Sequence, residues 1–427
     1  MAVIELGLVT DGDPAPRDSG PLLARPFVAA ALVVCCLLAL SGSEVPGQHG
    51  MRTLWSLPAD AGTTSYVTSG GSLYVLRTDE STLTAHDLHT GAVRWRTATA
   101  GDWIWQPGPG ADVLLLPTTP LGTDNPYTGA DLIAVDAHTG QQLWRRHGDL
   151  LDTAGGLALL LEWAAGDGTL RAVRLRDGSA AWSHAAPGWS EVLADAGSGR
   201  VVTATGEGTI DVYAYTDGHR LAGATIPWTT RPPDVLDSPG SSLRLMAGTL
   251  LLQRDDPGRE SLVTAYDTAT LTRLWQLTLP VYSGIVDCGP LLCVYAGDSL
   301  SGHDRATGER RWQLSQAANV SVLGTDRLLV EDFAEFRLLD AATGRAVADL
   351  GEARPVQDPR TGDVTGWFLA PTREPAGLTA VFRLDDRTGR LVLRGAIPRV
   401  PDVTCIVGDG VLACPSGGGR LLVNATG

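Results

Sequence analysis

A short motif recurs along this chain, and its spacing constrains the fold more strongly than any other feature of the sequence. Its fullest copy, Ala-Val-Asp-Ala-His-Thr-Gly-Gln-Gln-Leu-Trp, ends at Trp144. Residues 87–95 and 304–312 repeat its Asp, Thr-Gly and Trp at the same spacing, and residues 267–275 do so with Leu271 in place of glycine. Degenerate copies place their glycine at Gly178, Gly218, Gly344 and Gly389. A period of about 40 residues indicates that one supersecondary unit is repeated.

Each copy lies within a series of short strand-like segments. The first unit contains SYVTSGG, SLYVLRT and STLTAHD, followed by Thr-Gly and AVRWRT. Apolar residues broken by Gly, Asp and Ser are strand and hairpin signals. The sequence therefore predicts an all-β chain folded as a β-propeller with one four-stranded blade per unit.

The motif residues have distinct structural tasks in such a blade. Glycine adopts a positive φ at no steric cost in the hairpin turn between the third and fourth strands. The aspartate four residues earlier accepts backbone N–H groups at the strand end. The tryptophan four residues after the glycine lies on the outer strand, where it can pack between blades. The residues interpreted as structural are Trp55, Gly91, Trp95, Gly140, Trp144, Gly178, Trp182, Trp275, Gly308 and Trp312.

Six further tryptophans, half of the 12 in the chain, fall outside the motif. Aromatic side chains off the repeat are the better candidates for a binding face, although core packing is the alternative for most of them. They are Trp103, Trp105, Trp163, Trp189, Trp228 and Trp367.

The turn positions set the number of blades. Eight turns are followed by a fourth strand, and the chain then ends on Asn-Ala-Thr-Gly with no strand after it. We expect Arg52 to Trp55 to supply that strand, because pairing the two ends removes exposed sheet edges. Eight blades is our prediction, with nine or seven as alternatives.

The motif resembles that of the PQQ-like β-propeller repeat family, Ala-x-Asp-x-x-Thr-Gly-x-x-x-Trp, over residues 52–427. That family includes quinoprotein alcohol dehydrogenases, the assembly factor BamB, and sensor domains of bacterial kinases. The resemblance implies a bacterial propeller, and it does not specify a function. Enzymatic relatives carry a vicinal disulfide against the quinone, a calcium ion and a catalytic aspartate. The adjacent cysteines of this chain, Cys35 and Cys36, lie in an apolar segment that cannot serve, so we expect no enzyme activity and no cofactor.

An apolar segment precedes the repeats. Residues 27–40 read FVAAALVVCCLLAL, and extension to residues 22–42 gives a helix of about 31 Å, enough to cross a hydrocarbon core of about 30 Å. The acidic leader before it favours an uncleaved anchor over a cleaved signal peptide. We therefore predict a cytoplasmic tail (1–21), a single transmembrane segment (22–42), a linker (43–51) and a propeller (52–427) outside the cytoplasm.

The composition narrows the choice of partners. The formal net charge is −15, and all 33 basic side chains are arginine. An acidic protein lacks the basic face that nucleic acid requires. The same balance argues against docking onto anionic lipid through the propeller surface.

Four cysteines are placed for hairpin disulfides. Cys405 and Cys414 flank Asp-Gly symmetrically, so a two-residue turn puts them opposite each other. Cys288 and Cys293 flank Gly-Pro in the corresponding hairpin of an earlier unit. An exported domain permits disulfides, which we favour over a metal site because the two hairpins belong to different blades.

No catalytic or metal-binding constellation stands out. His89 and His138 occupy equivalent turn positions, which is typical of exposed turn residues. Acidic residues in the long loops 118–129 and 229–241 are candidate calcium ligands, with solvated loop polarity as the alternative. The sequence thus favours a membrane-anchored, non-enzymatic binding or scaffold module for protein or cell-envelope partners. The alternatives are an extracytoplasmic small-molecule sensor and, less favoured, a PQQ-dependent dehydrogenase.

Overall fold

The structure of the chain is a computed structural model. It describes residues 51–426 apart from 60–63, 107, 109–110, 119–129, 165–166, 187, 229–239, 256–259, 281–282, 316, 318, 333–334, 359–361 and 402–404. Residues 1–50, with the predicted tail and transmembrane segment, lie outside this part, as does most of both candidate calcium loops. Among the described residues, no helix has the length and apolar character needed to span a membrane.

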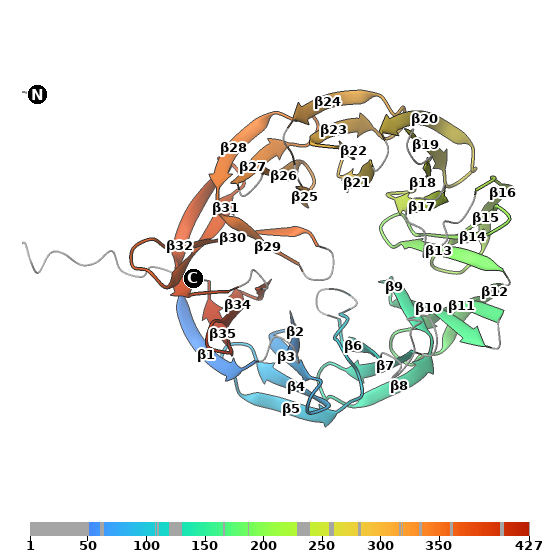
Figure 1. Cartoon of the computed structure of the whole chain (residues 1–427). Coiled ribbons are helices and arrows are strands. Elements are labelled where there is room, and N and C mark those ends of the chain that lie inside the picture. Colours follow the sequence, from blue (N-terminus) through green and yellow to red (C-terminus); the bar gives the residue numbers. More distant parts are fainter. Residues whose placement is uncertain are drawn as a thin grey trace, which may run out of the picture. The chain divides into compact units, whose positions relative to one another are not determined.

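The described residues form a ring of nine antiparallel sheets, each one blade (Figure 1). Blade 1 contains β2 (Thr64–Ser69), β3 (Ser72–Arg77), β4 (Thr82–Asp87) and β5 (Val93–Ala98). Blade 2 contains β6 (Val113–Pro117), β7 (Asp131–Asp136) and β8 (Gln142–His147). Blade 3 contains β9 (Asp149–Ala154), β10 (Leu157–Ala164), β11 (Asp167–Arg174) and β12 (Ala180–Ala186). Blade 4 contains β13 (Trp189–Asp195), β14 (Arg200–Thr205), β15 (Thr209–Ala214) and β16 (Arg220–Thr225).

The second half continues in the same way. Blade 5 contains β17 (Gly240–Met246), β18 (Thr249–Asp255), β19 (Glu260–Asp267) and β20 (Arg273–Pro280). Blade 6 contains β21 (Gly284–Cys288), β22 (Leu291–Ala296), β23 (Ser299–Asp304) and β24 (Arg310–Ser315). Blade 7 contains β25 (Asn319–Leu323), β26 (Arg327–Asp332), β27 (Glu335–Asp340) and β28 (Ala346–Gly351). Blade 8 contains β29 (Arg354–Gln357), β30 (Val364–Pro371), β31 (Leu378–Asp385) and β32 (Arg390–Pro398). Blade 9 contains β33 (Ile406–Gly408), β34 (Val411–Ser416), β35 (Arg420–Ala425) and β1 (Arg52–Pro58).

The prediction of eight blades is therefore wrong, and its nine-bladed alternative is correct. Each of the eight internal turns belongs to a blade of its own, including blade 2, which has three strands. In that blade, a single bridge from Trp105 to Leu115 takes the place of an inner strand. The composite blade made from the two chain ends is the ninth.

The two ends of the ring meet as the sequence predicts. Strand β1 pairs antiparallel with β35, with Arg52 opposite Ala425. The hydroxyl of Thr53 donates a 2.7 Å hydrogen bond to Oδ1 of Asn424, a fully buried side chain. The amide of Asn424 in turn donates to the carbonyls of Leu412 and Leu422. One buried asparagine thus ties β1, β34 and β35 together.

Burial of apolar surface is distributed evenly around the ring. The buried residues of the described chain fall into nine apolar clusters, and each cluster joins one pair of neighbouring blades. The cluster between blades 9 and 1, for example, joins Val411 and Val423 to Leu73 and Val75. No interface lacks a cluster, so the ring is closed by side-chain packing as well as by strand pairing.

A tryptophan wedge marks six of the nine interfaces. The indole of Trp144 lies against the turn glycine of the next blade, Gly178, where an added Cβ would lie 2.7 Å from its Cγ. The indole N–H donates a 2.8 Å hydrogen bond to the carbonyl of Leu175, three residues before that glycine. The glycine is thus required twice, for its φ of +67° and for the close approach of the ring. The same arrangement joins Trp55 to Gly91, Trp95 to Gly140, Trp182 to Gly218, Trp275 to Gly308 and Trp312 to Gly344.

Leu271 stands where the other turns have glycine, and the neighbouring blade 4 explains this exception. Blade 4 has Ala222, not tryptophan, at the wedge position, opposite Val212. Leu271 is buried in the cluster between blades 4 and 5, and Ala222 packs against that cluster. Because Ala222 is small, space remains for a large side chain at the turn position. Leu271 fills this space and has a φ of +53°.

The turn aspartates act as caps. One carboxylate oxygen of Asp304 accepts hydrogen bonds from the backbone N–H groups of Ala306 and Thr307 and from the Thr307 hydroxyl. The ion pair with Arg311, together with these bonds, lowers the pKa of Asp304 to about 2. Hydrogen bonds led by those from Thr343 and Thr388 likewise hold the pKa of Asp340 and of Asp385 below the usual range.

These shifts predict sensitivity to acid. The folded-state pKa lies below the unfolded value of about 3.9, so the stabilisation is complete above that value and is lost as the pH falls towards 2. We expect the urea midpoint of the wild type to fall steeply between about pH 4 and pH 2. Asp304→Asn, which cannot ionise, should flatten this dependence, whereas Asp298→Asn at an exposed turn should not. If the urea midpoints of Asp304→Asn and of the wild type changed with pH in parallel, the capping role of Asp304 would be contradicted.

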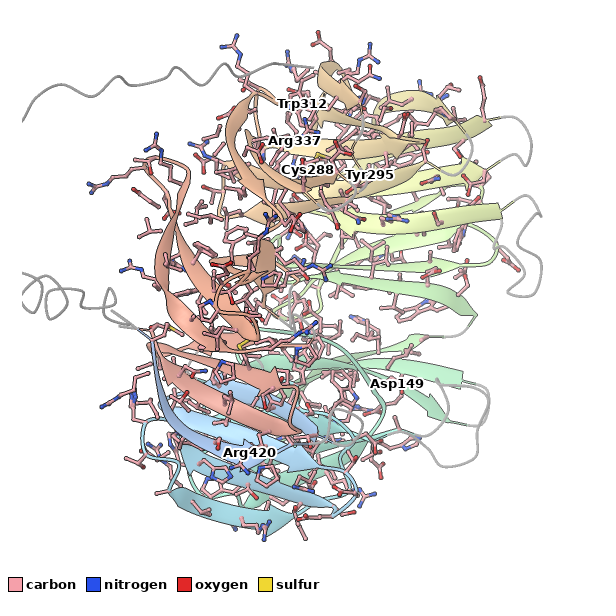
Figure 2. The ribbon with its side chains drawn as sticks, turned by 60° about the vertical axis from the view of Figure 1, so that its left-hand side comes forward. Asp149, Cys288, Tyr295, Trp312, Arg337 and Arg420 are labelled. Carbon is pink, nitrogen blue, oxygen red and sulfur yellow. A yellow bond between two sulfur atoms is a disulfide. The ribbon has the colours of Figure 1, made fainter. Side chains whose placement is uncertain are left out.

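Both predicted disulfides are present. Cys405 is bridged to Cys414 and Cys288 to Cys293, with Cα–Cα distances of 4.3 and 5.6 Å. Gly408 pairs with Val411, as the symmetric turn requires. The other pair is diagonal, since Cys293 lies opposite Val286. Cys288 belongs to the cluster between blades 6 and 7, where Tyr295 and Trp312 also pack (Figure 2).

Candidate functional site

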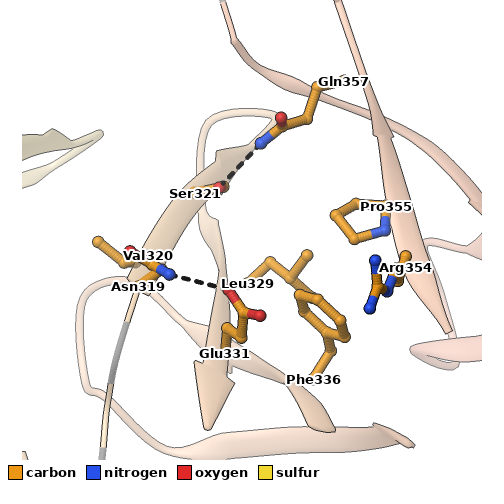
Figure 3. A pocket seen from close by; sticks show the side chains of 9 residues that line it. All are labelled: Asn319, Val320, Ser321, Leu329, Glu331, Phe336, Arg354, Pro355 and Gln357. Atoms are coloured by element: carbon orange, nitrogen blue, oxygen red, sulfur yellow. Dashed lines mark hydrogen bonds between the residues drawn. The ribbon is translucent and has the colours of Figure 1, made fainter. Parts of the chain in front are cut away.

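A pocket of about 440 Å³ opens between blades 7 and 8 (Figure 3). Its walls come mainly from β25 and β29, which are the terminal strands of their sheets on the inner side of the ring. Strands β26 and β27 supply the rest. The lining residues are Asn319, Val320, Ser321, Leu329, Glu331, Phe336, Arg354, Pro355 and Gln357.

The pocket combines an apolar floor with a polar rim. Leu329 and Phe336 are buried and belong to the cluster that joins blades 7 and 8, so the floor is held by the core of the ring. At the rim, the amide of Asn319 donates a 2.9 Å hydrogen bond to Glu331, and the amide of Gln357 donates a 3.4 Å bond to Ser321. The second bond connects the two blades across the pocket.

Arg354 is the positively charged side chain of the pocket rim. It is exposed, and its guanidinium makes no hydrogen bond or ion pair with the described residues. A guanidinium presents five N–H donors in a fixed fork that suits carboxylates. The pocket can therefore bind an apolar group on its floor and an acidic or carbonyl group at Arg354.

A second feature is an acidic stretch on the inner strands of blades 3 and 4. Burial raises the pKa of Asp149 and Asp152 on β9 and of Glu191 on β13. Asp149 is labelled in Figure 2. No three His, Cys, Asp or Glu side chains of the described residues are grouped so that they could hold a metal ion.

The structure gives the off-motif tryptophans different surroundings. Trp228 and Trp367 are buried, and Trp189 packs against the cluster between blades 3 and 4. Trp105 donates a 3.2 Å hydrogen bond to Thr153 of the next blade. Trp103 is 42 % exposed and contacts Trp105 edge-on, with ring centroids 5.6 Å apart. None of these five lines the pocket between blades 7 and 8.

The histidines lie where the repeat places them. His138 is exposed in its turn and lies 3.0 Å from Asp112, and the backbone of His89 is capped by Asp87. The residues of the pocket were missed by the sequence reasoning because they share no motif. The sequence contained one sign that blade 7 differs from the other blades. Its wedge position is Ala348, not tryptophan, and Ala348 pairs with Leu338.

Comparison with known proteins supports the fold and the family. A family model described as outer membrane protein assembly factor BamB matches residues 47–276. A solved eukaryotic initiation factor is 12 % identical, with a TM-score of 0.52, over 83 % of this chain and 100 % of that chain. BamB from Moraxella catarrhalis is 13 % identical over 88 % and 99 %, with a TM-score of 0.41. A europium-containing methanol dehydrogenase is 12 % identical over 88 % and 93 %, with a TM-score of 0.38. No curated protein sequence matches this chain.

Proposed function

Because this chain belongs to the PQQ-like propeller family described as outer membrane protein assembly factor BamB, we propose that it is a membrane-anchored scaffold that binds a protein partner. In this proposal, residues 22–42 remain as an uncleaved anchor and the propeller lies outside the cytoplasm. N-terminal sequencing that begins at Gly42 or later would contradict the anchor.

The observation that carries the proposal is the pocket between β25 and β29. Both are terminal strands, so an extended segment of another protein can align with their backbones while one side chain enters the pocket. The apolar floor at Phe336 and the guanidinium of Arg354, which has no partner among the described residues, suit a segment with an apolar residue next to an acidic one. Propeller rings commonly present such inner surfaces to partners.

Crosslinking in intact membranes tests this binding mode. A photo-crosslinking amino acid at Gln357 is expected to yield a discrete protein adduct, and Arg354→Glu should reduce that adduct at least tenfold by placing a like charge opposite the acidic group. The matched control is Arg310→Glu, on the exposed start of β24. An adduct unaffected by Arg354→Glu, or reduced equally by Arg310→Glu, would contradict the proposal.

The pocket volume supports one alternative, an extracytoplasmic sensor of a small molecule, because about 440 Å³ lies within the usual range for such ligands. A protein adduct that still forms when the membranes are dialysed extensively before irradiation favours the scaffold, whereas loss of the adduct when a small-molecule extract is added before irradiation favours the sensor. We further propose that the chain is not an enzyme. Dye-linked alcohol or sugar oxidation above a heat-killed control, with added pyrroloquinoline quinone and calcium, would overturn that proposal.

A further inference from the structure

The outer edge of blades 7 and 8 carries an exposed apolar patch. Val347 of β28 is 40 % exposed, and Val392 and Leu393 of β32 are 43 % and 60 % exposed. The two strands adjoin, since a Cβ on Gly389, in the turn before β32, would lie 2.9 Å from Cγ1 of Val347. We call Val347, Val392 and Leu393 the rim patch. Leu393 has the highest exposure of the large apolar side chains in the described chain.

Packing within the ring does not account for the rim patch. In blade 1, the residue opposite Ala85 is the wedge Trp95, which lies against the next blade. In blade 8, the corresponding position opposite Arg383 is Val392, because the strand bulge has moved to Arg394. Two consecutive apolar side chains, Val392 and Leu393, therefore remain at the surface where six of the other blades have a wedge tryptophan.

Arginines surround the patch in an otherwise acidic protein. Residues 386–399 contain four arginines and one aspartate, against a net charge of −15 for the whole chain. Arg390, Arg394 and Arg399 are exposed, and their guanidinium groups make no hydrogen bond or ion pair with the described residues. Arg345, immediately before β28, is likewise exposed. The acidic groups on the same segments, residues 345–352 and 385–399, are Asp349, Glu352, Asp385 and Asp386, and Asp385 is engaged in capping its turn.

The first described residue of the chain lies against the same strand. Met51 is buried, and its backbone N and its Cβ would lie 3.2 and 2.9 Å from a Cβ on Gly395 of β32. Residues 43–50 separate this point from the proposed anchor, and eight residues span at most about 29 Å when extended. Strand β32 therefore adjoins the point at which the chain leaves the propeller towards the proposed anchor.

We propose that the rim patch and its arginines contact the surface of an anionic lipid bilayer. Exposed apolar side chains enter the headgroup region, and arginines are attracted by the negative surface potential over about one Debye length. The net charge of the chain argues against lipid docking, but it averages over the whole ring and conceals this basic edge. The inference rests on the membrane anchor proposed above.

Lipid photo-crosslinking tests the proposal. The full chain, reconstituted in vesicles containing phosphatidylglycerol, carries a photo-crosslinking amino acid at Leu393 or, as a control, at Leu274. Leu274 is 42 % exposed on β20, the outer strand of blade 5, three blades away. We expect lipid adducts at position 393 at least tenfold above those at position 274. The double variant Arg390→Glu, Arg394→Glu should lower the yield at least tenfold, since each arginine contributes roughly fivefold, whereas Arg273→Glu should not.

The outcomes separate the two proposals. Protein that does not float with the vesicles contradicts the anchor. Protein that floats but gives equal lipid adducts at positions 393 and 274, or adducts unaffected by the double variant, contradicts the lipid contact while the anchor stands. Protein–protein adducts at position 393 in place of lipid adducts would show that the patch covers a second copy of the chain, and would likewise overturn the proposal.

Discussion

Gly178→Ala is expected to lower the free energy of unfolding by about 2 to 5 kcal/mol. Positive φ costs an L-residue about 1 to 2 kcal/mol, and overpacking a filled site costs about 1 to 3 kcal/mol more. Both terms apply here, because φ is +67° and the new methyl group would lie 2.7 Å from the Trp144 ring. Displacement of that ring also weakens its 2.8 Å hydrogen bond to Leu175. Urea unfolding followed by intrinsic fluorescence measures the change.

Two comparisons separate the causes. Gly297 has a φ of +64° but no atom within 4 Å of an added Cβ, so Gly297→Ala should cost only about 1 to 2 kcal/mol. Trp144→Ala removes the obstacle, so the double variant with Gly178→Ala should be clearly less destabilised than the sum of the single variants. Additive effects, or equal losses for Gly178→Ala and Gly297→Ala, would show that the wedge does not depend on the missing Cβ.

Asn424→Ala is expected to cost about 2 to 4 kcal/mol and to loosen blade 9 first. The side chain is fully buried and makes hydrogen bonds to Thr53, Leu412 and Leu422. Its removal leaves buried polar groups without partners, each at a cost of about 1 to 3 kcal/mol. Hydrogen exchange should show faster exchange in β1 and β35 than in blade 5.

The control for this substitution is Thr53→Val. It removes the one hydroxyl that donates to Asn424 and leaves both bonds made by the amide in place. Because Thr53 is exposed, water can replace its hydroxyl, and we expect a loss below about 1 kcal/mol. If Asn424→Ala were no more harmful than Thr53→Val, the asparagine would not be a closure element.

The features that the sequence predicted are those that depend on local spacing. The intervals from Gly140 back to Asp136 and forward to Trp144 are set within one hairpin, so the turn and the wedge can be located without knowledge of other blades. The symmetric flanks of Asp409-Gly410 likewise predict the pairing of Cys405 with Cys414, which the structure contains.

Features that arise between blades were harder to predict. The pocket combines Asn319 and Arg354, which belong to different sheets and share no motif. The blade count failed because β1 completes an additional blade and does not replace one of the eight internal units. The rim patch depends on a two-residue change in the position of the β32 bulge relative to the turn glycine, and hydrophobicity alone does not reveal such a change.

The pairing of β1 with β35 also fixes the order in which this chain can be completed during synthesis. Thr53 and Asn424 are 371 residues apart, so β1 emerges long before its partner exists. At about 5 to 20 residues per second, the wait is roughly 20 to 75 s. During that interval β1 has an unpaired edge, and blade 1 lacks the neighbour that covers Leu73 and Val75. An exposed edge and an open apolar face are the features that chaperones recognise and that lead to misassembly. The newly made chain therefore depends on protection until its last strand arrives, and a truncated chain never loses that dependence.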